Sequence, residues 1–172
     1  MSLCQIKRAF FIPAVLWMLI IFIFSAMPED ISEEQSDYVS IRLQKIIMAT
    51  LSGNKEEAKN EWDEWSEESP RIPVRKMAHV IEYAVLCMLL YVGLAGGKHA
   101  GLLSVLLTVL YAVTDEVHQL FVPGRAGLFV DVLIDSIGAG VGLVLILLLG
   151  RVIRSRKERM INRICEMPAK RK

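Results

Sequence analysis

The sequence predicts an all-α membrane protein, a four-transmembrane-helix bundle with an extracytoplasmic amphipathic helix between its first and second spans. Two observations lead to this fold class. The chain of 172 residues is 53% hydrophobic, which exceeds the share in a typical soluble domain. Its apolar residues gather in runs close to the ~20 residues that a spanning helix needs. These runs lack the alternation of barrel strands, and helices are the other structure that satisfies the backbone in lipid.

The first apolar run covers residues 9–27 and is interrupted only by Ser25, with Lys7 and Arg8 before it. A cleaved signal peptide is the alternative interpretation. The run is longer than the ~7–15 apolar residues of a signal core, and no small-x-small cleavage site follows it. We therefore expect a retained span.

An outer insertion over residues 28–75 separates the first span from the second and carries twelve acidic against six basic residues. Within it, Ser32 and Gln35 have the spacing of a capping box. Apolar residues then recur at helical spacing as far as Leu51, before Gly53. This pattern predicts an amphipathic helix that covers the tops of the other helices or lies on the membrane surface.

Three further spans are predicted at residues 77–95, 101–122 and 128–149. With the first span and the insertion they form one membrane domain over residues 1–150. A basic tail, residues 151–172, follows and is expected to lie on anionic lipid headgroups. We predict membrane lipids as its partners and no nucleic acid.

The distribution of Lys and Arg predicts the topology, because cytoplasmic loops are enriched in these residues. Both termini carry clusters of them, whereas the short loop between the last two spans has only Arg125. We therefore expect both termini in the cytoplasm and the insertion and the Arg125 loop outside. The three cysteines, Cys4, Cys87 and Cys165, all fall away from the predicted outer segments, so no disulfide framework is expected.

Ionisable and polar residues from three predicted spans recur at one depth, near the outer ends of the helices. Such groups are costly at membrane depth and face protein or water when they occur. A common depth on three separate helices therefore predicts one outward-facing polar pocket. Its predicted binding residues are Lys76, His79, Glu82, Tyr83, Asp115, Glu116, Gln119, Arg125, Asp131 and Asp135.

The chemistry of this pocket has more than one interpretation. His79 with Asp115 or Glu116 could supply an acid and a base, and these three are the catalytic candidates. The same residues with Glu82 could hold a divalent metal, although the His79-x-x-Glu82 spacing is a weak metal signal. We assign no metal ligand and predict no cofactor.

Two glycines, Gly138 and Gly142, continue the helix face of Asp131 and Asp135. Small residues four apart let another backbone approach closely in a membrane. Tight packing within the chain is the preferred interpretation, and a homo-oligomer through the same glycines is the alternative.

Three motifs together resemble the VanZ-like family of bacterial membrane proteins. They are Lys76-x-x-His79-x-x-x-Tyr83, then Asp115-Glu116-x-x-Gln119-x-Phe121-x-x-Gly124-Arg125, and finally Asp131-x-x-x-Asp135-x-x-Gly138-x-x-x-Gly142. Many members of the family carry Asn at the position of Asp135. The resemblance places the chain in the bacterial cytoplasmic membrane. It also implies an association with reduced susceptibility to glycopeptide antibiotics of the teicoplanin type, and it implies no established reaction.

Three functions stay open from the sequence. The first is a binding protein whose pocket takes an envelope lipid, a lipid-linked cell-wall precursor or a lipoglycopeptide. The second is an intramembrane hydrolase or transferase that acts on an envelope lipid, with or without a metal. The third is a structural polar network in a protein that acts through protein partners.

Overall fold

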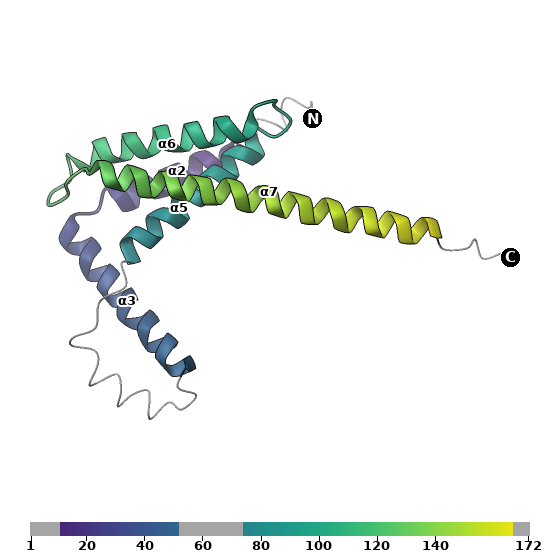
Figure 1. Cartoon of the computed structure of the whole chain (residues 1–172). Coiled ribbons are helices and arrows are strands. Elements are labelled where there is room, and N and C mark those ends of the chain that lie inside the picture. The colour runs from purple at the N-terminus through teal and green to yellow at the C-terminus, as the bar shows by residue number, and fades with distance from the viewer. Residues whose placement is uncertain (1–10, 52–73, 167–172) are drawn as a thin grey trace.

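The protein is all-helical in the part that the structure, a computed structural model, describes (Figure 1). That part comprises residues 11–51 and 74–166. Residues 9–10 of the predicted first span, residues 52–73 of the insertion and residues 167–172 of the tail lie outside it. The described helices are α2 (Ile12–Ser25), α3 (Glu29–Leu51), α5 (Val74–Gly93), α6 (Ala100–Gln119) and α7 (Phe129–Glu166).

Helices α5, α6 and α7 form the centre of the bundle, and each is long and apolar enough to cross a membrane. They match the second, third and fourth predicted spans; the boundaries of α5 and α6 and the start of α7 differ by a few residues, whereas α7 ends later than predicted. The turn after α5 contains Gly96 at φ +89°, a backbone conformation that side chains with a Cβ rarely adopt. The membrane character predicted from the apolar runs is thus confirmed for three spans.

The contact between α5 and α7 is the closest in the bundle because two glycines of α7 face the α5 backbone. A Cβ on Gly138 would lie 2.5 Å from the carbonyl oxygen of Val80, and one on Gly142 would come still nearer to that of Ala84. Real Cβ atoms do not come this close, so only glycine permits this contact. The predicted tight packing within the chain is confirmed, and α5 occupies this glycine face.

The first predicted span differs from the expectation. Helix α2 has 14 residues, which at ~1.5 Å per residue is about 21 Å, short of the ~30 Å of a bilayer core. It is long enough for a span only together with α3, from which it is bent by 103°. The described residues therefore contain three candidate spans, or four if this bent pair is one span.

The start of α3 corrects the predicted capping box. The helix begins at Glu29, so Ser32 lies inside its first turn and not at the cap. The Pro28 carbonyl already accepts the Ser32 amide at 3.1 Å, as the carbonyl of an N-cap residue does. Acidic residues at Glu29 and Asp30 also suit the positive end of the helix dipole. The helix therefore starts four residues earlier than a cap at Ser32 would place it.

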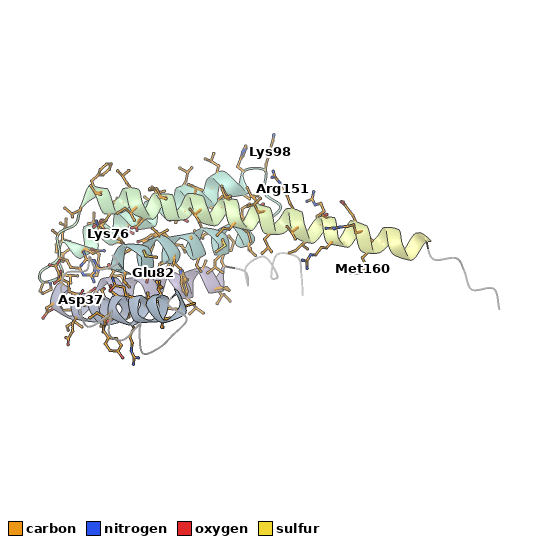
Figure 2. The ribbon with its side chains drawn as sticks, turned by 60° about the horizontal axis from the view of Figure 1, so that its bottom comes forward. Asp37, Lys76, Glu82, Lys98, Arg151 and Met160 are labelled. Atoms are coloured by element: carbon orange, nitrogen blue, oxygen red, sulfur yellow. The ribbon has the colours of Figure 1, made fainter. Side chains whose placement is uncertain are left out.

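Helix α7 continues past the predicted end of the last span at residue 149 and runs for 38 residues to Glu166. The residues after Gly150 include many good helix formers, and the next proline is Pro168. The first part of the basic tail is thus helical. Figure 2 shows Arg151 and Met160 on this extension, with Lys76 and Glu82 near the opposite end of the bundle.

Polar contacts attach the short α2 to the central helices. The Trp17 indole Nε1 donates to the carbonyl oxygen of Glu82 on α5 at 2.9 Å, and the Tyr111 hydroxyl of α6 donates to the Met18 carbonyl at 2.6 Å. Ile21 of α2 and Leu86 of α5 are buried in the same apolar core. These contacts hold the middle of α2 against the middle of α5 and against α6.

Candidate functional site

The polar residues singled out in the sequence gather at one end of the bundle, where α5 and α7 begin and α6 ends (Figure 1). The junction of α2 and α3 lies at the same end. Several of these side chains are almost inaccessible, with exposed fractions of 2% for Asp115 and 1% for Asp135. Such burial of carboxylates is unusual, because a charged carboxylate is costly away from water unless it is paired.

A histidine and a buried aspartate face each other in this region. The Nδ1 atom of His79 lies 3.7 Å from Oδ1 of Asp135. Neither Nδ1 nor the two Asp135 oxygens has a hydrogen-bond partner within the described residues. A small cavity of about 10 Å³, lined by both side chains and by Lys76, Gln119 and Asp131, has about the volume that one water molecule needs.

Asp115 and Tyr83 lie deeper in the bundle. Gln119 Nε2 donates to Oδ2 of Asp115 at 3.1 Å, so this carboxylate is held by a residue one turn further along α6. The Tyr83 ring has no exposed surface and stacks against His79 with the ring centroids 6.3 Å apart. These side chains support the site from behind and do not line its larger cavity.

Glu116 holds the turn between α6 and α7. Its Oε2 accepts the backbone N–H of Leu128 at 2.9 Å, and a Cβ on Gly127 would lie 2.6 Å from the Glu116 carbonyl oxygen. On the other side of the turn, Gly124 has φ +79° and packs against Glu29 of α3. The turn is thus fixed at both ends, and Arg125 lies between them.

Burial lowers the pKa of the Arg125 guanidinium from its usual value, and the nearby charge of Arg75 lowers it further. Asp115, Glu29 and Glu116 act in the opposite direction. Because arginine stays protonated in proteins, Arg125 brings a positive charge into the site. Its guanidinium forms no salt bridge within residues 11–51 and 74–166, and its buried Nε has no hydrogen-bond partner there.

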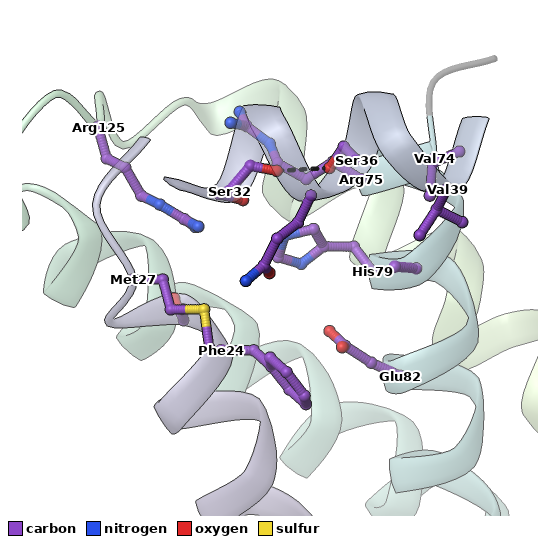
Figure 3. A pocket seen from close by; sticks show the side chains of 13 residues that line it. Phe24, Met27, Ser32, Ser36, Val39, Val74, Arg75, His79, Glu82 and Arg125 are labelled. Atoms are coloured by element: carbon purple, nitrogen blue, oxygen red, sulfur yellow. Dashed lines mark hydrogen bonds between the residues drawn. The ribbon is translucent and has the colours of Figure 1, made fainter. Parts of the chain in front are cut away.

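A larger cavity of about 260 Å³ lies between α2, α3, α5 and the Arg125 turn (Figure 3). Figure 3 shows Arg125 and Glu82 reaching into it from opposite sides. Part of the wall is apolar, and α3 adds a polar strip. The lining residues are Phe24, Ser25, Met27, Ser32, Gln35, Ser36, Val39, Val74, Arg75, Ala78, His79, Glu82 and Arg125.

The residues predicted from the sequence therefore fall into three places. The larger cavity is lined by His79, Glu82 and Arg125, and the small cavity by Lys76, His79, Gln119, Asp131 and Asp135. Tyr83, Asp115 and Glu116 are buried behind them.

Arg75 lines the larger cavity but was not among the residues predicted from the sequence. The neighbouring Lys76, which was chosen, is exposed and lines only the small one. Arg75, His79 and Glu82 have i, i+4 and i+7 spacing, so they share one helix face, and Lys76 is turned from it by about 100°. That spacing could have identified Arg75. A cation in the first turn of a helix also opposes the helix dipole, which suggests a role other than helix stability.

The four residues proposed as metal ligands are not brought together. No group of three or more His, Cys, Asp or Glu side chains in the described part of the chain could hold a metal ion. Glu82 faces the larger cavity, whereas Asp115 is bonded to Gln119 and Glu116 to the Leu128 amide. Each carboxylate thus has a different environment.

Comparison with known proteins adds one finding. The family model described as VanZ/LLP1 matches residues 10–150, which include the described helices from α2 to the apolar part of α7. Neither the curated proteins nor the solved structures contain a match to this chain.

Proposed function

The chain is a membrane protein of the VanZ/LLP1 family, and from this premise we propose that its larger cavity binds the anionic group, phosphate or carboxylate, of the headgroup of an envelope amphiphile. The ligand is an envelope lipid, a lipid-linked cell-wall precursor or a lipoglycopeptide. The observation that carries this proposal is the half-buried Arg125 guanidinium, which faces the cavity without a salt bridge among the described residues. A guanidinium binds phosphate or carboxylate through two parallel hydrogen bonds, so an anion is the ligand that this group favours.

The composition of the wall supports an amphiphile over a soluble anion. Arg75 and His79 are close to Arg125 in the lining, while Phe24, Met27 and Val39 provide apolar surface. Phe24 is half exposed, so the apolar part of the wall continues onto the outer surface of the bundle. Such an arrangement suits a polar headgroup in the cavity and a hydrocarbon chain along the side of the helices.

The proposed location follows from the charge distribution. We infer that the protein lies in the bacterial cytoplasmic membrane with both termini in the cytoplasm, so that the cavity opens outward. An outward cavity gives access to the leaflet that carries cell-wall precursors. Through this site the protein would lower the susceptibility of the cell to glycopeptide antibiotics of the teicoplanin type.

The test is binding by the purified protein in nanodiscs. Labelled polyprenyl phosphate and labelled teicoplanin are titrated against the native protein, Arg125→Gln and the control Lys98→Gln. Loss of one charge-assisted contact of ~1.5–3 kcal/mol predicts roughly 10- to 100-fold weaker binding by Arg125→Gln and native affinity for Lys98→Gln. Equal affinity of all three proteins for both probes contradicts the proposal and favours a structural role for the charges.

One observation favours an enzymatic alternative, an intramembrane hydrolase or transferase. His79 lines the larger cavity and has the buried Asp135 carboxylate on its other side, an arrangement in which a carboxylate can orient an imidazole. Release of phosphate or of a free headgroup from lipid extracts by the native protein, and not by His79→Gln, would support this function.

A further inference from the structure

The larger cavity carries a negative charge as well as positive ones. Glu82 lines it and, within the described residues, its carboxylate has no hydrogen bond or salt bridge. Only its backbone carbonyl is engaged, by the Trp17 indole. An unpaired carboxylate that loses water on ligand binding is costly, so a ligand that covers it must offer a donor or a positive charge.

The two arginines of the cavity differ in whether a carboxylate pairs with them. Arg75 NH1 lies 3.7 Å from Glu29 Oε1, so a carboxylate of α3 already balances its charge. Arg125 forms no salt bridge among the described residues. One unbalanced cation, Arg125, and one unbalanced anion, Glu82, therefore face the same cavity from opposite sides (Figure 3).

A purely anionic headgroup satisfies only half of this arrangement. Its phosphate would pair with Arg125, but it would leave the Glu82 carboxylate unpaired and repelled at short range. A headgroup with a phosphate and an ammonium pairs with both residues at once, and like-charge repulsion disappears. The charge pattern thus disfavours lipids with a purely anionic headgroup and favours lipids with a zwitterionic headgroup.

The volume restricts the size of the headgroup. At about 260 Å³ the cavity lies just below the ~300–1,000 Å³ of pockets that enclose drug-sized ligands. A disaccharide–pentapeptide or a glycopeptide is several times too large to be enclosed, whereas an aminoalkyl phosphate fits. The apolar side chains Phe24 and Val39 then lie where the acyl chains leave the cavity.

We propose that the cavity binds a zwitterionic phospholipid headgroup of the phosphoethanolamine class, with its phosphate on Arg125 and its primary ammonium on Glu82. This inference rests on the proposed function, because it takes the same cavity as a phosphate site and adds the second charge of the ligand. It gives Glu82 the role of a specificity-determining residue.

Trp17 provides a local reporter for the test, because its indole donates to the Glu82 carbonyl at 2.9 Å. The chain has three tryptophans, so a Trp62→Phe/Trp65→Phe background leaves Trp17 as the only source of tryptophan fluorescence. Short-chain phosphatidylethanolamine and phosphatidylglycerol with identical acyl chains are titrated into this protein in detergent. The same titrations are made with Glu82→Gln, Arg125→Gln and, as a matched control, Glu34→Gln on the exposed face of α3.

We expect phosphatidylethanolamine to bind at least about 10-fold more tightly than phosphatidylglycerol, the size of one charge-assisted contact. Glu82→Gln should abolish this preference. It should bind phosphatidylglycerol as tightly as the reporter protein or more tightly, since the repulsion is gone, and a misfolded protein would lose both lipids. Glu34→Gln should keep the preference.

Equal affinity of the reporter protein for the two lipids overturns the inference, and so does a preference that persists in Glu82→Gln. If Arg125→Gln weakens the binding of both lipids in such a case, the phosphate site is supported and only the specificity for a zwitterion is contradicted. If Arg125→Gln changes neither lipid, the proposed function falls as well.

Discussion

Arg75 and Lys76 are adjacent cations at the start of α5, but their surroundings differ. The difference arises because successive residues of a helix are rotated by about 100°. Arg75 lines both the larger and the small cavity and is balanced by Glu29, whereas Lys76 is exposed and lines only the small cavity. From the sequence, Lys76 was grouped with His79, Glu82 and Tyr83 on one helix face, and the structure adds Arg75 to the wall of the larger cavity. Arg75 is distinguished from Lys76 because it lies closer to the direction of His79 and Glu82 around the helix.

This difference gives a matched pair of substitutions. Arg75→Gln removes a charge from the cavity wall and should weaken binding of a phosphate-bearing lipid by up to about fivefold, less than Arg125→Gln does, because Glu29 already pairs with Arg75 and such partly exposed ion contacts contribute at most ~1 kcal/mol. Lys76→Gln should leave the affinity within about twofold. Both are measured by the same lipid titration in nanodiscs, and a larger loss for Lys76→Gln would restore the assignment made from the sequence.

Helix packing depends on glycines at specific positions of α7. Gly138 and Gly142 lie against backbone atoms of α5, while a Cβ added to Gly140 on the same helix would meet nothing within 4 Å. The three residues have the same intrinsic helix preference. Any difference between them must therefore come from the contact with α5.

We expect Gly142→Ala to lower the free energy of unfolding by ~1–3 kcal/mol, the usual cost of overpacking a close contact. Gly140→Ala should raise it by ~0.5–1 kcal/mol, because alanine is the better helix former. Thermal unfolding in detergent measures both changes. A Gly142→Ala variant as stable as the Gly140→Ala variant would show that α5 and α7 are not packed this closely.

The turn between α6 and α7 depends on a hydrogen-bond acceptor, the Glu116 carboxylate, for the Leu128 amide. Glu116→Ala leaves the Leu128 amide without its partner, so this amide should exchange its hydrogen roughly 10-fold faster or more. Glu116→Gln keeps a carbonyl oxygen there and should retain most of the protection. Hydrogen–deuterium exchange of the peptide that contains Leu128 measures the effect. If the Leu128 amide is equally protected in all three proteins, the Glu116 side chain does not hold the turn that carries Arg125.

The elements themselves were predictable where local rules and burial agree. Long apolar runs predicted α5, α6 and the apolar part of α7 to within a few residues. The glycine spacing predicted a close helix contact of α7 within the chain, but not that α5 is the partner. The start of α3 was missed because the spacing of Ser32 and Gln35 matches a capping box, whereas the helix begins at Glu29, directly after Pro28. The site was predicted as a cluster at one depth, but its division into a larger and a smaller cavity depends on side-chain directions across helices, which sequence spacing does not specify.

Over the whole molecule, the charge distribution makes a prediction about orientation. Ala126, in the turn beside Arg125, should face outward, and Ser155, on the helical extension of α7, should face the cytoplasm. In a background without the three native cysteines, a membrane-impermeant maleimide should label Ala126→Cys in intact cells. It should label Ser155→Cys only after permeabilisation. The reverse pattern would place the cavity on the cytoplasmic side.

The short α2 has a consequence for the surrounding lipid. Where a helix of about 21 Å crosses a hydrocarbon layer of ~30 Å, the hydrophobic mismatch is relieved by local thinning of the bilayer. The lipids beside α2 would then sink toward the midplane, and their headgroups would approach the depth of Phe24 and Met27 at the cavity wall. A headgroup could enter sideways from its own leaflet, with its chains still in hydrocarbon, and the deformation of the membrane would become part of how the protein takes up its ligand.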